Sequence, residues 1–157
     1  MLGSLPSRRS IAEQQYYAHP QNAFWPIMRE IFGIDGSYED RCNQLVDHRV
    51  ALWDVLASSE RPGSMDADIR LDSARANDFD DFLVAHPDLR LIAFNGRTAQ
   101  QLFQKLVNIQ TINASMRQVV MPSTSPAYAA MPFLGKLDAW RESILVSASE
   151  QLARRGR

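Results

Sequence analysis

The chain has 157 residues, of which 45% are hydrophobic and 22% charged, with a formal net charge of −1. These proportions match an average soluble globular protein and exclude a disordered, collagen-like or fibrous chain. No apolar run reaches the about 18 residues that a membrane span needs, and the opening MLGSLPSRR lacks the apolar core of a secretory signal.

The charge and cysteine content narrow the class of protein further. The chain has one cysteine, Cys42, which forms no internal disulfide and cannot hold a structural zinc or an iron–sulfur cluster alone. We therefore expect the protein to be located in the reducing cytoplasm. A protein that coats DNA phosphates usually carries a basic excess, which is absent here. Any DNA contact must therefore be local. We expect residues 1–157 to form a single domain.

Short β-rich runs alternate with longer amphipathic stretches, which is typical of an α/β domain. The predicted strands cover residues 1–2, 50–55, 89–94 and 118–121. The first is very short, so either the natural start lies upstream or this strand is a stub.

Helices are predicted over residues 22–32, 78–85 and 98–107, and from near Pro132 towards the C-terminus. Gly33 ends the first of these helices, and Asn77 is the expected N-cap of the second. Apolar residues of the last helix are expected on one side: Phe133, Leu134, Leu137, Trp140, Ile144, Leu145, Ala148 and Leu152.

Helices between strands imply crossover connections, and therefore a mostly parallel sheet covered on both faces. In such folds the ligand crevice lies at the carboxyl ends of the strands. That rule points to residues 3–7, the region after Val55, residues 95–96 and residues 122–127.

Two of these segments have distinctive composition. In GSLPSRRSIAEQQYYAHPQNAFW, residues 3–25, a tight turn can present backbone N–H groups, and two tyrosines and a histidine precede a helix. Core packing explains these aromatics equally well, and a helix N-cap is the commonest role for Asn22. In MPSTSPAYAAMP, residues 121–132, prolines and several hydroxyls form a stiff loop. Asp54 and Asp66 also fall on the crevice side, where capping or turn stabilisation is the commoner role.

Motifs for several standard chemistries are absent from the sequence. It contains no dinucleotide fingerprint, phosphate loop, G-x-S-x-G elbow or histidine pair at zinc spacing. The residues alone therefore predict an α/β domain whose crevice carries aromatic and amide side chains.

Five segments in order, GSLPS, QQYYAHPQNAFW, ALWDVLASSERPGSMDADI, LIAFNGRTAQQLF and MPSTSPA, resemble the uracil-DNA glycosylase superfamily. Its hypoxanthine-DNA (deoxyinosine) glycosylase group is the most similar branch. The resemblance implies a three-layer α/β/α sandwich around a four-stranded parallel sheet. It also implies a monofunctional glycosylase of base excision repair, which flips a deaminated base out of double-stranded DNA and hydrolyses its bond to deoxyribose.

The resemblance also implies roles for individual residues. Asn22 matches the catalytic amide, which orients a water and hydrogen-bonds the departing base. The base pocket is expected to comprise Gly3, Ser4, Leu5, Pro6, Ser7, Tyr17, His19 and Asn95, with the flipped base stacked on Tyr17. The DNA-binding loop is expected to comprise Pro122, Ser123, Thr124, Ser125, Pro126 and Tyr128. Tyr128 is the candidate wedge in the duplex, although packing on the last helix explains it equally well.

Three positions depart from the patterns of the family. Leu5 stands where related enzymes carry Asn or Asp, Met121 stands where the second motif often begins with His or Asn, and Ser7 replaces a glycine. Both usual polar catalytic side chains are thus missing. We therefore expect preorganised dipoles in a dry pocket to stabilise the leaving anion. No metal or cofactor is implied, and we expect a monomer without a membrane partner.

Two alternatives remain at the level of sequence. The first is a mismatch-specific or broad uracil/xanthine-DNA glycosylase with the same fold, because those enzymes share the AHPxNxFW pattern. The second is a noncatalytic module that binds damaged DNA, because the usual catalytic side chains are missing.

Overall fold

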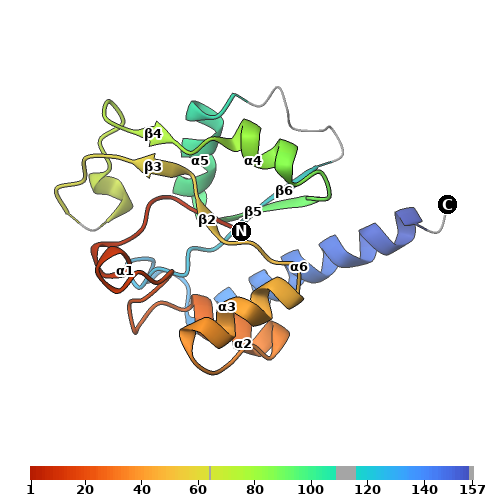
Figure 1. Cartoon of the computed structure of the whole chain (residues 1–157). Coiled ribbons are helices and arrows are strands. Elements are labelled where there is room, and N and C mark those ends of the chain that lie inside the picture. Colours follow the sequence, from red (N-terminus) through yellow and green to blue (C-terminus); the bar gives the residue numbers. More distant parts are fainter. Residues whose placement is uncertain (64, 109–115, 156–157) are drawn as a thin grey trace.

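The structure is a computed structural model that describes residues 1–63, 65–108 and 116–155, with side chains as far as residue 144. Its elements in chain order (Figure 1) are β1 (Leu2–Gly3), α1 (Arg8–Glu13), α2 (Phe24–Phe32), α3 (Tyr38–Asp47), β2 (Trp53–Asp54), β3 (Leu56–Ser58), η1 (Asp66–Asp68), β4 (Arg75–Ala76), α4 (Phe79–Ala85), β5 (Leu91–Asn95), α5 (Arg97–Leu106), β6 (Arg117–Met121) and α6 (Phe133–Arg155). No helix among the described residues is long and apolar enough to cross a membrane.

The main sheet has four parallel strands in the order β2-β1-β5-β6. Leu2 of β1 pairs with Trp53 on one side and with Phe94 on the other, so the shortest strand lies inside the sheet. The predicted strand over residues 50–55 is wrong in its extent. Only residues 53–54 join this sheet, and β3 then pairs antiparallel with β4 in a separate two-stranded sheet.

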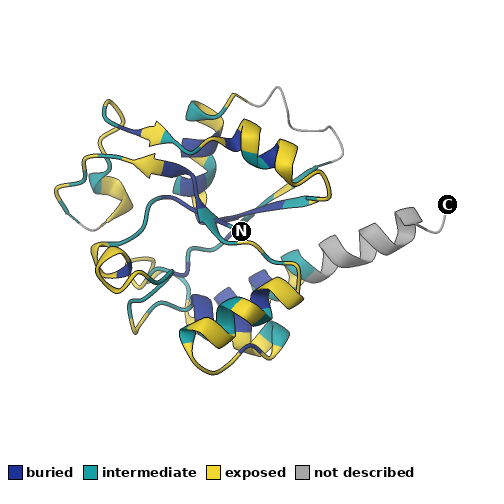
Figure 2. Cartoon of the chain, viewed as in Figure 1, coloured by how far each residue is buried: buried dark blue, intermediate teal, exposed yellow. Residues whose placement is uncertain are grey.

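Helices cover both faces of the main sheet, which confirms the predicted α/β/α sandwich. Figure 1 shows α2, α3 and α6 below the sheet and α4 and α5 above it. Buried side chains fill both layers (Figure 2), with one cluster around Phe24, Met28 and Trp140 and another around Phe94 and Phe103. The sheet is thereby held between two apolar layers, and its strand ends remain available for a site.

Helix α2 follows the prediction closely. Phe24, Trp25, Ile27 and Met28 are buried, and the helix ends at Gly33, whose φ of 72° favours glycine.

Helices α4 and α6 differ from the prediction in detail. The N-cap of α4 is Asp78, which accepts a hydrogen bond from the Asp81 N–H; Asn77 instead donates from its side chain to the Asp54 carbonyl. In α6, Leu137 and Trp140 are buried, but Phe133 and Leu134 are exposed. The predicted one-sided stripe is therefore wrong in its first turn, because α6 packs on the core through its following turns. Leu145, Ala148 and Leu152 lie outside the described side chains.

Two further helices were not predicted, although each begins with a recognisable capping pattern. Ser7 caps α1 by accepting a hydrogen bond from the Ser10 N–H at 3.1 Å. Ser37 and Asp40 form a capping box at the start of α3. The serine that replaces a motif glycine at position 7 thus has a structural role.

Candidate functional site

A cavity of about 1110 Å³ opens at the carboxyl ends of the parallel strands. It is lined by the turn after β1, the loop before α2, the loop after β3, and the segments that follow β5 and β6. Every residue that the sequence predicted for the site lines this cavity: Gly3, Ser4, Leu5, Pro6, Ser7, Tyr17, His19, Asn22, Asn95, Pro122, Ser123, Thr124, Ser125, Pro126 and Tyr128. The strand-end rule therefore located the crevice correctly.

The turn after β1 passes very close to two polar side chains. A Cβ added at Gly3 would overlap Asp54 Oδ1 and lie 3.3 Å from Tyr17 Oη. Only glycine fits here without displacing one of them. The next residue, Ser4, donates a hydrogen bond of 2.6 Å from Oγ to Asp66 Oδ1, which fixes the turn against η1.

Tyr17 has a strained backbone and a well-defined ring position. Its φ of 56° lies in the left-handed region, which is a rare conformation for an aromatic residue. One ring face stacks on Phe24, with centroids 4.1 Å apart and planes inclined by 23°. Burial raises the pKa of the Tyr17 phenol, and the neighbouring Asn95 side chain partly offsets this shift. Backbone strain that persists in a cavity wall points to a functional constraint.

Asn22 is oriented by the start of α2. The Phe24 N–H donates to Asn22 Oδ1 at 3.0 Å, and the Asn22 N–H donates to the His19 carbonyl at 2.8 Å. The N-cap position itself belongs to Ala23, so Asn22 caps the helix from one residue earlier. No described residue accepts a hydrogen bond from Asn22 Nδ2. This N–H pair is therefore available to a ligand in the cavity.

Asn95 joins the second motif to the end of β5. Its Nδ2 donates to Thr124 Oγ1 at 2.8 Å, and the Thr124 N–H donates to Asn95 Oδ1, also at 2.8 Å. The Thr124 carbonyl accepts from the Ala23 N–H at 3.0 Å. Thr124 is 0% exposed, so it departs from its predicted place among the DNA-contacting residues. Because its polar groups are engaged inside the protein, Thr124 holds the loop in position.

Helix α6 holds the loop of residues 122–128 at two points. Trp140 Nε1 donates to the Pro122 carbonyl at 2.8 Å, and Lys136 Nζ donates to the Ser125 carbonyl at 3.2 Å. The same ammonium group lies 5.3 Å from the centroid of the Tyr128 ring. Tyr128 remains 39% exposed.

Sequence reasoning did not include Asp54, Arg61, Asp66 or Arg97 among the site residues, yet all four line the cavity. Asp54 is 6% exposed, and burial together with the Asp66 charge raises its pKa to about 7. Arg61 donates to the Pro6 carbonyl. Asp54 lies at the end of a strand and Arg97 lies just after one. This position is the feature of the sequence that could have identified both as site residues.

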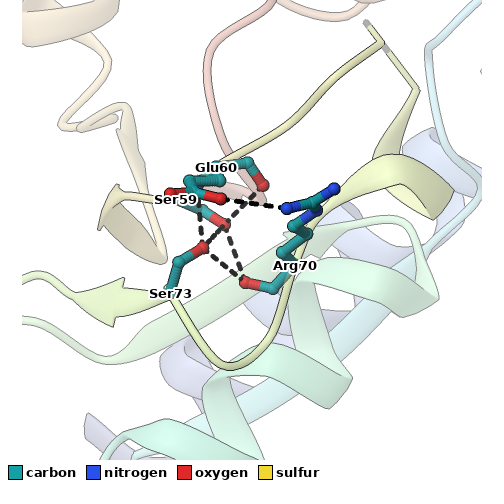
Figure 3. A network of polar contacts seen from close by, with 4 residues as sticks. All are labelled: Ser59, Glu60, Arg70 and Ser73. Atoms are coloured by element: carbon teal, nitrogen blue, oxygen red, sulfur yellow. Dashed lines mark hydrogen bonds and ion pairs between the residues drawn. The ribbon is translucent and has the colours of Figure 1, made fainter.

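The loop that carries Arg61 and Asp66 is closed at its base by a polar network (Figure 3). Ser59 Oγ donates to the Arg70 carbonyl at 3.0 Å, and the Glu60 N–H donates to Ser73 Oγ at 2.9 Å. Glu60 and Arg70 add an ion pair at 3.2 Å. These contacts fix both ends of the loop, so the network helps to hold Arg61 and Asp66 in the cavity wall.

No group of three or more His, Cys, Asp or Glu side chains within the described residues is placed to bind a metal ion. The site presents a stacked aromatic ring, a free amide donor, a buried carboxyl group and a firmly held loop. Such a cavity can bind a planar, polar ring and stabilise negative charge on it.

Comparisons with known proteins agree on one family. A sequence profile of the Uracil DNA glycosylase superfamily matches residues 1–145. The Hypoxanthine DNA glycosylase of Methanosarcina acetivorans is 38% identical over 130 residues, covering 81% of this chain and 78% of that protein. The Hypoxanthine DNA glycosylase of Methanosarcina barkeri is 37% identical over 100 residues, or 62% of each chain. A solution NMR structure from Methanosarcina acetivorans, named for uracil DNA glycosylase, superposes with a TM-score of 0.70 at 35% identity, covering 90% of this chain and 87% of that one.

Proposed function

This chain belongs to the uracil DNA glycosylase superfamily, and we propose that it is a monofunctional DNA glycosylase that removes hypoxanthine from deoxyinosine in double-stranded DNA. The relatives named above support hypoxanthine as the base. The observation that carries the proposal is the Asn22 amide, which α2 holds in the same cavity as Tyr17, with no acceptor for its N–H groups among the described residues. We further propose a monomeric, cytoplasmic enzyme that acts in base excision repair.

The cavity suits a base that has left the duplex. Its volume of about 1110 Å³ exceeds the roughly 300–1,000 Å³ of ordinary small-ligand pockets, so a nucleotide fits together with part of the strand. The flipped base stacks on Tyr17, whose opposite face is supported by Phe24. Tyr128 fills the gap in the duplex, and the loop over residues 122–126 follows the backbone.

The proposed chemistry depends on stabilising the leaving base. As the bond from C1′ to the base breaks, negative charge develops on the base and positive charge on the sugar. Asn22 Nδ2 donates to the departing base, since Asn22 Oδ1 is already bonded to the Phe24 N–H. Removing one such preorganised donor typically costs about 2.7–4 kcal/mol of transition-state stabilisation. Leu5 lines the cavity at the position where related enzymes carry a polar side chain, and it offers no group that would compete with the amide.

The experiment compares two substitutions at Asn22 on end-labelled oligonucleotides. Each duplex carries one inosine, uracil or xanthine, and alkali cleaves the abasic sites that the enzyme leaves. Asn22→Asp keeps an oxygen that caps α2 but loses the N–H donor, whereas Asn22→Ala loses both. We expect wild type to act on inosine, and both variants to be slower by about 10²–10³-fold.

The alternatives give different results in the same assay. Cleavage chiefly at uracil would move the chain to the uracil-directed or broad enzymes of the superfamily. If the protein binds these duplexes but releases no deaminated base, the noncatalytic DNA-binding module is the remaining interpretation. An active Asn22→Asp enzyme would show that the side chain acts as an acceptor that orients water.

A further inference from the structure

The proposed function leaves one buried acid of the cavity without a role. Asp54 ends β2 and is only 6% exposed, yet it lines the cavity wall. No described residue hydrogen-bonds or forms an ion pair with its carboxyl oxygens. An isolated ionised carboxylate in such surroundings is costly, so burial favours the neutral acid.

The position of this acid relates it to the base. Asp54 Oδ1 and Tyr17 Oη both contact the point where a Cβ of Gly3 would lie, so they converge at the hydroxyl end of the Tyr17 ring. A base stacked on that ring extends its edge towards the same end. Asp54 lines the same cavity, at the hydroxyl end of the ring on which the proposed base stacks.

The charged groups around Asp54 also favour the protonated form. Asp66 of η1 is the nearest like charge, and its Oδ1 already accepts the hydroxyl of Ser4. Arg61 is the opposing cation, and it donates to the Pro6 carbonyl. Tyr16 and Tyr17 from the loop before α2 are the other titratable neighbours. Burial, which is the largest cause, and the Asp66 charge outweigh the opposing Arg61 and raise the pKa of Asp54 to about 7.

We infer that Asp54 is a catalytic acid, whose protonated carboxyl group donates its hydrogen to the base as the base leaves. This inference rests on the proposed function and adds a second donor to Asn22. The bond from C1′ to the base breaks, and its electron pair stays on the base. The proton moves from Asp54 to a ring nitrogen or carbonyl oxygen of that base, which departs neutral. Water then adds to C1′, and the proton it loses restores Asp54, directly or through solvent.

The test is the pH dependence of single-turnover base release from an inosine duplex, with saturating enzyme, between pH 5.5 and 9. Three proteins are compared: wild type, Asp54→Asn and Asp88→Asn. Asp88 is a fully exposed carboxylate that precedes β5, whereas the cavity lies at the other end of this strand, so its variant controls for loss of one charge. Asp54→Asn keeps a hydrogen-bond donor that does not titrate.

We expect the wild-type and Asp88→Asn rates to fall by about tenfold per pH unit above the pKa of Asp54. The rate of Asp54→Asn should not show this fall with pH, and at pH 6 it should be about 10²-fold below the wild-type rate. The proteins should therefore differ least at high pH.

Two outcomes would overturn the acid role. One is a falling limb that persists in Asp54→Asn, and the other is a wild-type rate that rises through pH 7, as for a catalytic base. The wild-type profile alone decides this point if the variant does not fold. Failure of wild type to release any deaminated base at any pH would instead overturn the proposed function.

Discussion

The raised pKa of Asp54 predicts how the free energy of unfolding changes with pH, and this prediction does not depend on enzymatic activity. The pKa is about 7 in the folded protein, against the ordinary value of 3.8 for an aspartic acid side chain in water. The folded state therefore binds more protons than the unfolded state between about pH 4 and pH 7, and stability must fall as pH rises through this window. At 1.36 kcal/mol per pH unit, the full effect is about 4 kcal/mol. This is a large part of the about 5–15 kcal/mol that stabilises a typical domain.

Urea unfolding of wild type and Asp54→Asn between pH 4 and pH 9 isolates this contribution, because all other groups titrate in both proteins. The free energy of unfolding of wild type should decline relative to the variant as pH rises, and the difference should level off above pH 8. Asp54→Asn should be the more stable protein at pH 8, since its amide carries no buried charge. A difference that stays constant with pH, or that grows in favour of wild type, would refute the reasoning.

Three further substitutions test the cavity and its supports. Gly3→Ala should reduce single-turnover base release at least about tenfold, because its methyl group displaces Asp54 or Tyr17; an unchanged rate would contradict the close fit. Asn95→Ala should lower the free energy of unfolding by about 2–3 kcal/mol, since it leaves buried groups of Thr124 unpaired, and urea midpoints would measure this. Lys136→Met should raise the Kd for an abasic-site duplex several-fold with little change in rate at saturation, because it frees one end of the loop of residues 122–128, which we propose to bind DNA. Equal affinity of the two proteins in a titration would argue against that role.

The sequence predicted the architecture well because the two apolar layers dominate it. Strands β5 and β6 and helix α2 carry strong local patterns, and the structure places them as expected. Strand β1 has only two residues, so its central place in the sheet depends on pairing with β2 and β5 rather than on its own propensity. Helices α1 and α3 were not predicted, because their apolar periodicity is weak. The capping residues Ser7 and Ser37 were the main evidence in the sequence for these two helices.

The site divides in the same way. The rule of strand ends and the motif segments identified the cavity, because a parallel sheet brings the carboxyl ends of its strands together. What required the structure was the state of each side chain. Thr124 is buried, and among the described residues Asn22 has a free N–H pair and the Asp54 carboxyl group has no partner. Those properties arise from contacts between segments far apart in the chain, which no local pattern encodes.

The most direct test of the account is detection of the free base. A duplex with one deoxyinosine is incubated with the purified chain, and the small molecules released are separated and identified by mass. We expect free hypoxanthine in equal amount to the abasic sites formed, with the DNA strand intact until alkali is added. An uncut substrate, or a strand cut by the protein with hypoxanthine still attached to its sugar, would contradict it.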